Sequence, residues 1–185
     1  LWQPKERRRR CNGRFYCDKS PALSMLAAPF YALSKPILAA SDVRIKVLYA
    51  RQWSMAWTVC LLGALAAVLF YRMTILFGAS GQESLALTMF LIYGTNLGGY
   101  TSLFYPYLPA ACCIVAAYTL VLSARRRGGA FGAGRAAAVG FLCSMAGFFE
   151  FTFGLAGLAT MAVAAWEMRP RRRAVWMILA ACLPA

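Results

Sequence analysis

Long apolar segments alternate with short polar or basic segments over most of this chain, and the pattern predicts helices of membrane-spanning length. About 20 residues of helix cross a hydrocarbon core of roughly 30 Å. The segments that meet this requirement, within a bundle domain of residues 53–166, are about 53–71, 85–104, 107–123 and 143–166. We therefore expect an all-α fold: a polytopic helical membrane protein with about four transmembrane helices and interfacial helices at its N- and C-terminal ends.

The two ends of the chain differ from this central bundle. Residues 1–52 form a basic extension in which Pro29 and Pro36 interrupt an apolar stretch, so we expect a kinked or interfacial helix there rather than a span. A basic amphipathic helix over about 43–51 then leads into the first span. Residues 167–185 comprise a basic knot and a final apolar stretch that is too short to cross a bilayer.

The basic segments conflict with four sequential crossings. In most membrane proteins, Lys and Arg are concentrated in the loops on one side of the membrane. Four crossings, however, put residues 124–135 and 169–173 on opposite sides. A helical hairpin over 136–166 would bring the two segments together. Each half would be only about 21 to 24 Å long at 1.5 Å per residue, however, and no turn residue stands at the middle. We therefore prefer four spans and leave the orientation open.

Small residues recur at helical spacing within the apolar segments. Such stripes are typical of membrane helices, because they let helix backbones approach where lipid supplies no hydrophobic drive for association. The second span carries a GxxxG pattern, and the fourth carries glycines on one face. The predicted helix-contact residues are Gly63, Ala67, Gly94, Gly98, Gly147, Glu150, Gly154 and Gly157.

Glu150 is an acid within the long apolar run 136–166. An acid at mid-bilayer costs about 3 kcal/mol on insertion scales, so it is a functional candidate by default. If Trp166 marks one membrane–water interface, however, Glu150 lies within the hydrocarbon core only about 6 Å from the opposite interface. We therefore interpret Glu150 as a docking residue whose partner is on another helix or another chain. Arg72 is the nearest cation in the chain to test as that partner.

Cations far outnumber acids, with 20 Lys and Arg against 6 Asp and Glu and a formal net charge of +14. The arginines occur in runs beside apolar segments, and contact with anionic lipid head groups is the simplest explanation of this arrangement. Nucleic acid is not expected as a partner. Cardiolipin is a plausible bound phospholipid. The predicted anionic-lipid contacts are Arg51, Arg72, Arg125, Arg126, Arg127, Arg171, Arg172 and Arg173.

The sequence offers little for catalysis. It contains no histidine, and none of its seven cysteines forms a CxxC pair, so no metal, haem or Ser-His-Asp site is expected. No phosphate-binding loop, nucleophile elbow or pair of intramembrane carboxylates is found. The aromatic corner at residues 100–109 is typical of an interfacial belt rather than a quinone or lipid pocket. We therefore expect no catalytic residue, no metal and no cofactor apart from bound phospholipid.

These features favour a non-catalytic accessory subunit of a large membrane complex, with other membrane subunits and anionic lipids as its partners. The first 17 residues are Arg-rich and poor in acids, as organelle transit peptides are. The expected location is therefore the mitochondrial inner membrane, in a respiratory-chain complex or ATP synthase, with a plastid or bacterial membrane kept open. The alternative function is a small transporter or channel component with Glu150 and Asn96 along an ion or proton path.

Overall fold

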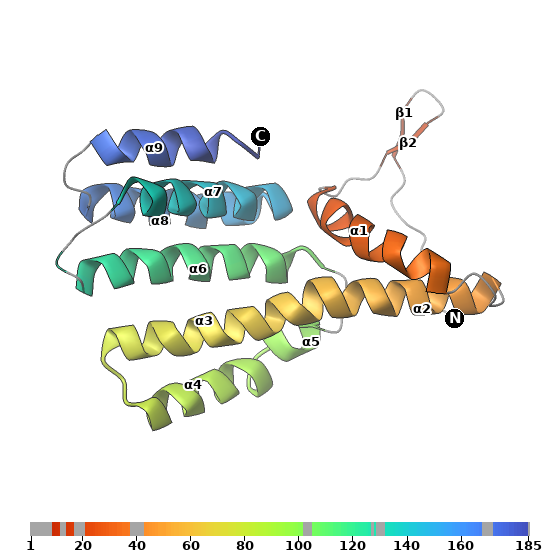
Figure 1. Cartoon of the computed structure of the whole chain (residues 1–185), viewed down its shortest axis with the longest axis horizontal. Coiled ribbons are helices and arrows are strands. Elements are labelled where there is room, and N and C mark those ends of the chain that lie inside the picture. The colour runs from red at the N-terminus through yellow and green to blue at the C-terminus, as the bar shows by residue number, and fades with distance from the viewer. Residues whose placement is uncertain are drawn as a thin grey trace.

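Helices make up nearly all of the chain that the structure describes (Figure 1). The computed structural model describes residues 9–11, 14–16, 21–37, 43–101, 105–126, 128, 132–167 and 172–184. The helices are α1 (Ala22–Ile37), α2 (Val43–Met55), the π-helical η1 (Ala56–Cys60), α3 (Leu61–Phe77), α4 (Gly81–Tyr93), α5 (Leu97–Thr101), α6 (Tyr107–Arg126), α7 (Ala133–Phe149), α8 (Thr152–Glu167) and α9 (Arg172–Ala181). A short antiparallel hairpin, β1 (Arg9–Cys11) and β2 (Arg14–Tyr16), precedes them. The expected all-helical class is confirmed apart from this hairpin.

Two stretches of helix are long and apolar enough to cross a membrane. The first is Leu48–Phe77, which belongs to the continuous helix made by α2, η1 and α3, and the second is Tyr107–Arg126, which is α6. The predicted spans 53–71 and 107–123 lie inside these two helices. At 1.5 Å per residue the first is about 45 Å long and the second about 30 Å, so only the second matches the bilayer core closely.

The helices α3 and α6 lie side by side and run in the same direction. A Cβ on Gly63 would stand 3.3 Å from Leu108 near the start of both helices. Near their ends, the rings of Phe77 and Tyr118 are 6.4 Å apart. Two parallel neighbours need a return segment, and α4 and α5 provide it along the outer side of α3 (Figure 1).

The predicted second span, residues 85–104, is wrong as a continuous helix. It is divided between α4 and α5, and the break lies at residues 94–96. The physical reason is local: the Thr95 hydroxyl donates to the Leu91 carbonyl, and its oxygen accepts from the Leu97 N–H at 3.2 Å. A side chain that bonds the backbone in this way competes with the helical ladder. At 13 residues, α4 is about 20 Å long and does not cross a bilayer core.

The predicted fourth span, residues 143–166, is also wrong as a continuous helix. The chain reverses after α7, and α8 returns along it as the second arm of a helical hairpin. At the turn, Glu150 has extended backbone angles (φ −149°, ψ 118°), and its carbonyl accepts the Phe153 N–H at 3.0 Å. The two arms approach closely here, since a Cβ on Gly147 would stand only 3.3 Å from the Cα of Gly154 and neither glycine has a side chain to separate the backbones. The structure therefore contains the helical hairpin that the sequence alone favours less than a single span.

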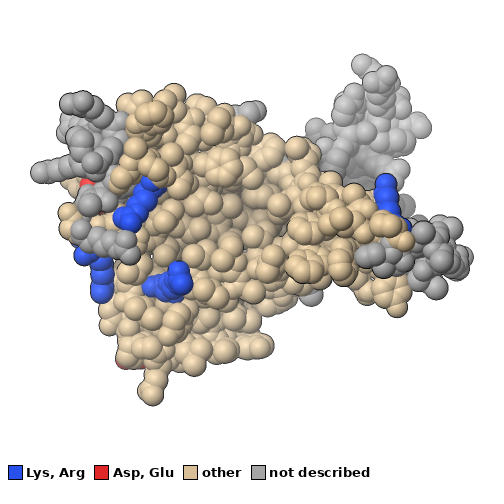
Figure 2. All heavy atoms as spheres, in the orientation of Figure 1, with Lys and Arg blue, Asp and Glu red and all other residues tan. Residues whose placement is uncertain are grey.

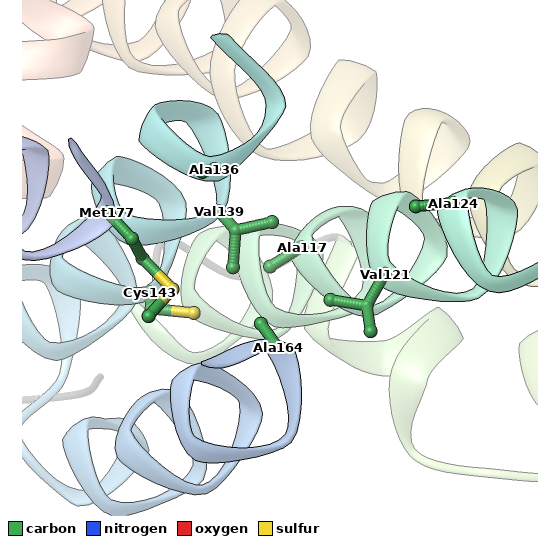
Figure 3. Packing of buried hydrophobic residues seen from close by; sticks show 8 residues of the cluster. All are labelled: Ala117, Val121, Ala124, Ala136, Val139, Cys143, Ala164 and Met177. Carbon is green, nitrogen blue, oxygen red and sulfur yellow. The ribbon is translucent and has the colours of Figure 1, made fainter. Parts of the chain in front are cut away.

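Small side chains fill the largest core, which joins four helices (Figure 3). It brings together Ala117, Val121 and Ala124 of α6, Ala136, Val139 and Cys143 of α7, Ala164 of α8, and Met177 of α9. Since most of these side chains are no larger than valine, the helix backbones lie near one another. The closest approach is between α7 and α9, where a Cβ on Gly140 would overlap the backbone carbonyl of Met177.

The helices α1 and α2 extend past the bundle on the side where α6 begins (Figure 1). The α1 helix packs along the first long helix, and the rings of Phe30 and Trp57 stack there with centroids 6.2 Å apart. Although Pro29 and Pro36 lie inside α1, the helix continues for 16 residues. We call α1 and residues 48–57 of the long helix the arm.

Candidate functional site

The outside of the bundle is richer in large apolar side chains than its inside. Among the described residues, many leucines and aromatics are exposed, as with Phe151 at 90% and Trp166 at 88% exposure. The buried side chains are largely alanines, serines and threonines, with a few larger ones such as Leu108 and Phe149. A soluble protein shows the opposite distribution, because water drives large apolar groups inward. The exposed apolar surface is large enough to mark contact with lipid or with other protein.

The hydroxyl side chains need no water or neighbouring helix to satisfy their donors. Ser54, Thr58, Thr88 and Thr160 each donate to the carbonyl four residues earlier, at distances of 2.6 to 2.9 Å. Such local bonds suit an apolar environment, in which an unpaired donor costs several kcal/mol. The exception in the described part of the chain is Ser84, whose Oγ is buried without a hydrogen-bond partner.

Arginines gather at the end of the bundle where α3, α6 and α8 end and α7 begins (Figure 2). We call this the basic end. The hairpin of α7 and α8 returns the chain to this end, so that the ends of α6 and α8 meet here. The ion pair between Nε of Arg125 and Oε1 of Glu167, at 3.8 Å, joins the ends of α6 and α8 at this place. Arg126 also lies here, with its guanidinium 3.6 Å from the position that a Cβ on Gly78 would take, beside the C-terminal end of α3.

Three tyrosines mark the opposite end of α6. Tyr100, Tyr105 and Tyr107 form a cluster with ring centroids 5.9 to 6.2 Å apart. From Tyr107 to Arg125 along α6 the distance is about 27 Å at 1.5 Å per residue, close to the thickness of a bilayer core. Aromatic side chains at one boundary and arginines at the other are the usual flanks of a membrane span.

The predicted helix-contact residues lie at several different places in the structure. Gly147, Gly154 and Gly157 lie where the two arms of the hairpin meet, and a Cβ on Gly157 would stand 2.8 Å from the Cys143 carbonyl. Gly63 packs against α5 and α6, where a Cβ would stand 2.6 Å from Cγ2 of Thr101. Ala67 is half-buried next to the more deeply buried Ala66.

Gly94 and Gly98 lie at the break between α4 and α5 rather than against a distant helix. A Cβ on Gly94 would meet Phe90, and one on Gly98 would meet the Ile92 carbonyl. The structure therefore does not bring the GxxxG pattern to a contact with a distant helix, because Gly94 ends α4 and Gly98 lies at the start of α5, on either side of the break.

Glu150 lies at the tip of the hairpin and is half-buried. Its backbone N–H donates to the Ala146 carbonyl at 3.0 Å. Arg72 does not pair with it, since Arg72 is at the basic end, and no other cation of the described segments pairs with the Glu150 carboxylate. Its established contribution is to the turn that reverses the chain.

The predicted lipid-contact arginines divide between the two ends. Arg72, Arg125 and Arg126 are exposed at the basic end. Arg51 is exposed on the arm, at the opposite end. Arg127 and Arg171 lie outside the described residues, and α9 includes Arg172 and Arg173, whose side chains lie outside the described part.

Cavities lined by residues that the structure describes open between the helices, and two of them concern the functional argument. One, of about 520 Å³, is lined by apolar residues and glycines of α7, α8 and the C-terminal segment. The other, of about 550 Å³, lies between α3, α6 and the start of α7. We call the second one the α3–α6 groove. It is lined by Leu69, Arg72, Ile75, Leu76, Ala116, Thr119, Leu120, Ser123 and Arg135.

Comparisons with protein-family models, with the curated proteins and with the solved structures found no match for this chain. Within the described ranges, no three His, Cys, Asp or Glu side chains gather closely enough to hold a metal ion. The geometry of the surface and of the basic end is therefore the basis for any functional argument.

Sequence reasoning missed two residues that matter in this geometry, Arg135 and Ser84, and it missed the partner of a third, Gly140. Arg135 lines the α3–α6 groove, but its neighbours in the groove come from helices far from it in the chain. Ser84 is fully buried, although it belongs to the polar segment 78–84. The helical phase of Gly140 puts it on one face with Gly147 and predicts a helix contact there. The structure shows that α9 makes this contact, where the sequence indicated only a short apolar tail.

Proposed function

We propose that this protein is an integral membrane protein. In this proposal α3 and α6 cross the bilayer, the hairpin of α7 and α8 enters beside them from the basic end, and Glu150 turns the chain near the other boundary. The exposed apolar surface and the separation of about 27 Å between the tyrosine cluster and Arg125 support it. By the positive-inside rule, the basic end faces the cytoplasm, or the matrix in a mitochondrion.

We further propose that the protein acts as a non-catalytic subunit of a larger membrane complex. The observation that carries this proposal is the length of the first helix. Leu48–Phe77 exceeds a bilayer core by about 15 Å, and the excess belongs to the arm. The arm carries exposed apolar side chains there, Leu48 at 55% and Trp53 at 39% exposure. Beyond the hydrocarbon core these side chains need a partner protein to cover them.

Blue-native electrophoresis of mildly solubilised membranes, with mass spectrometry of the bands, tests this proposal. The chain is expected to migrate within a larger complex. Trp53→Ser is expected to release it, whereas Leu65→Ala, a similarly exposed site on α3 facing lipid in this proposal, is expected to leave the complex intact. Migration of the unaltered chain as a lone protein of about its own mass of 20.3 kDa would overturn the subunit proposal.

For the location we propose the mitochondrial inner membrane, with a respiratory-chain complex or ATP synthase as the host. The support is the Arg-rich, acid-poor composition of residues 1–17. Immunoblots of fractionated cells test it, since the chain should then follow inner-membrane markers. Enrichment with plastid or plasma-membrane markers would contradict it.

A further inference from the structure

The α3–α6 groove combines a basic mouth with an apolar floor. Arg72 of α3 and Arg135 of α7 both line it, although 63 positions separate them in the sequence (135 − 72). No carboxylate lines the groove, and neither arginine forms an ion pair with another described residue. Two uncompensated guanidinium groups at one cavity favour an anionic occupant, and phosphate is the group that guanidinium binds best through paired N–H donors.

The remaining polar groups of the groove do not compete for this role. The Thr119 hydroxyl donates to the Val115 carbonyl at 2.7 Å, and the Ser123 hydroxyl donates to the Leu120 carbonyl at 2.9 Å. Their hydrogens are therefore committed to the backbone of α6. The free donors that face the groove come from the two arginines, which places the anionic group of an occupant at the basic end.

The rest of the lining is apolar and follows the direction of the helices. Leu69 and Leu76 lie about two turns apart along α3, on either side of Arg72, and Ala116 and Leu120 lie about one turn apart along the parallel α6. Seven residues of helix correspond to about 10 Å, so the floor extends for that distance away from the basic end. A hydrocarbon chain fits such a floor, whereas a free phosphate ion leaves it empty.

We propose that the α3–α6 groove is a binding site for an anionic phospholipid. Its head-group phosphate binds between Arg72 and Arg135, and one acyl chain lies along Leu69, Leu76, Ala116 and Leu120. This inference rests on the proposed membrane location, but it does not need the protein to be part of a complex. The cavity of α7 and α8 is not expected to bind an anionic head group in the same way, because its lining has no cation.

Native mass spectrometry of the full chain in detergent tests the site. Phosphatidylglycerol and phosphatidylcholine with identical acyl chains are added in parallel, so that the two lipids differ only in the head group. Both have the phosphate, but phosphatidylglycerol carries a net negative charge and phosphatidylcholine adds a cation that the two arginines repel. We therefore expect phosphatidylglycerol to bind about tenfold more tightly. Arg72→Gln and Arg135→Gln should each remove most of this preference. The matched control is Lys35→Gln, an exposed cation of α1 at the other end of the molecule, which should keep it.

A second variant tests the acyl chain and guards against loss of the fold. Ala116→Phe fills the floor without changing the charge and should weaken phosphatidylglycerol binding, while circular dichroism checks that helix content is kept. Equal binding of the two lipids, or an equal effect of Lys35→Gln and Arg72→Gln, would overturn the site. Displacement of the lipid by millimolar inorganic phosphate, with Ala116→Phe having no effect, would overturn it in favour of a free anion.

The lipid-site proposal and the subunit proposal can be overturned independently of each other. A chain that binds phosphatidylglycerol selectively but migrates alone in blue-native gels would keep the lipid site and overturn the subunit proposal. A chain that migrates in a complex without lipid selectivity would do the reverse.

Discussion

The guanidinium Nε of Arg125, near the end of α6, lies 3.8 Å from the carboxylate Oε1 of Glu167, at the end of α8. These residues are 42 positions apart in the sequence (167 − 125). They meet because the hairpin of α7 and α8 returns the chain to the end of the bundle from which it left. The contact therefore joins the ends of α6 and α8, which four sequential spans would have placed on opposite sides of a membrane.

The ion pair itself should contribute little to stability. Its side chains are 70% and 30% exposed, so water and salt screen the attraction between them. Glu167→Gln is expected to lower the free energy of unfolding by less than about 1 kcal/mol. A double-mutant cycle with Arg125→Gln, followed by circular dichroism during denaturation in detergent, measures the coupling. A coupling well above that value would show that the pair is shielded and holds the hairpin in place.

The contact between α7 and α9 should be sensitive to a single methyl group. Gly140→Ala places a Cβ against the Met177 backbone, which forces α9 outward and should cost about 1 to 3 kcal/mol of unfolding free energy. Gly134→Ala is the matched control, since it lies in the same helix with no atom within 4 Å of the added Cβ. It should be neutral or stabilise by up to about 1 kcal/mol through helix propensity. Equal effects of the two substitutions in thermal denaturation would contradict the packing of α9.

Acid should weaken the start of α4. Ser80 and Glu83 form a capping box, and the Ser80 N–H donates to Oε2 of Glu83 at 2.8 Å. The backbone hydrogen bond first, and the Ser80 side chain second, lower the pKa of Glu83 below its ordinary value. The stabilisation is therefore complete above the ordinary pKa and is lost as pH falls through the lowered one. A carbon-13 NMR titration should show a lowered pKa that Ser80→Ala returns toward the ordinary value; an unchanged pKa in the variant would contradict the capping box.

Glu150 should matter through its backbone more than through its charge. Glu150→Gln leaves the turn intact and should change the free energy of unfolding by no more than about 0.5 kcal/mol. Glu150→Pro should cost about 3 kcal/mol or more, because proline cannot adopt a φ of −149° and lacks the N–H that bonds Ala146. Denaturation of both variants checks this. If Glu150→Gln also abolished ion flux in reconstituted vesicles, Glu150 would belong to a transport path instead.

The sequence predicted the long helices well because their signal is continuous. The spans expected at 53–71 and 107–123 lie within helices that the structure extends at both ends or at one end. The two broken spans show where this reasoning fails. Hydropathy averages over residues 85–104 and does not register one Thr95 hydroxyl that diverts the backbone.

The hairpin tip was missed for a different reason. Its extended backbone at Glu150 is open to any residue, so no glycine or proline marks the turn. The glycines of this region were expected to face a helix, and the structure places Gly147 and Gly154 in a contact between the two arms of the hairpin. The α3–α6 groove could not be predicted, because Arg72 and Arg135 meet only through the packing of three helices.

The central claim is that both basic segments lie on one side of a membrane, and trypsin digestion of sealed native vesicles tests it most directly. Trypsin cleaves after arginine, so residues 125–127 and 171–173 each report the side they occupy. Mass spectrometry of vesicles in the two orientations should show both sites cleaved in one orientation and both protected in the other. Cleavage of one site with protection of the other, in the same vesicles, would contradict the account.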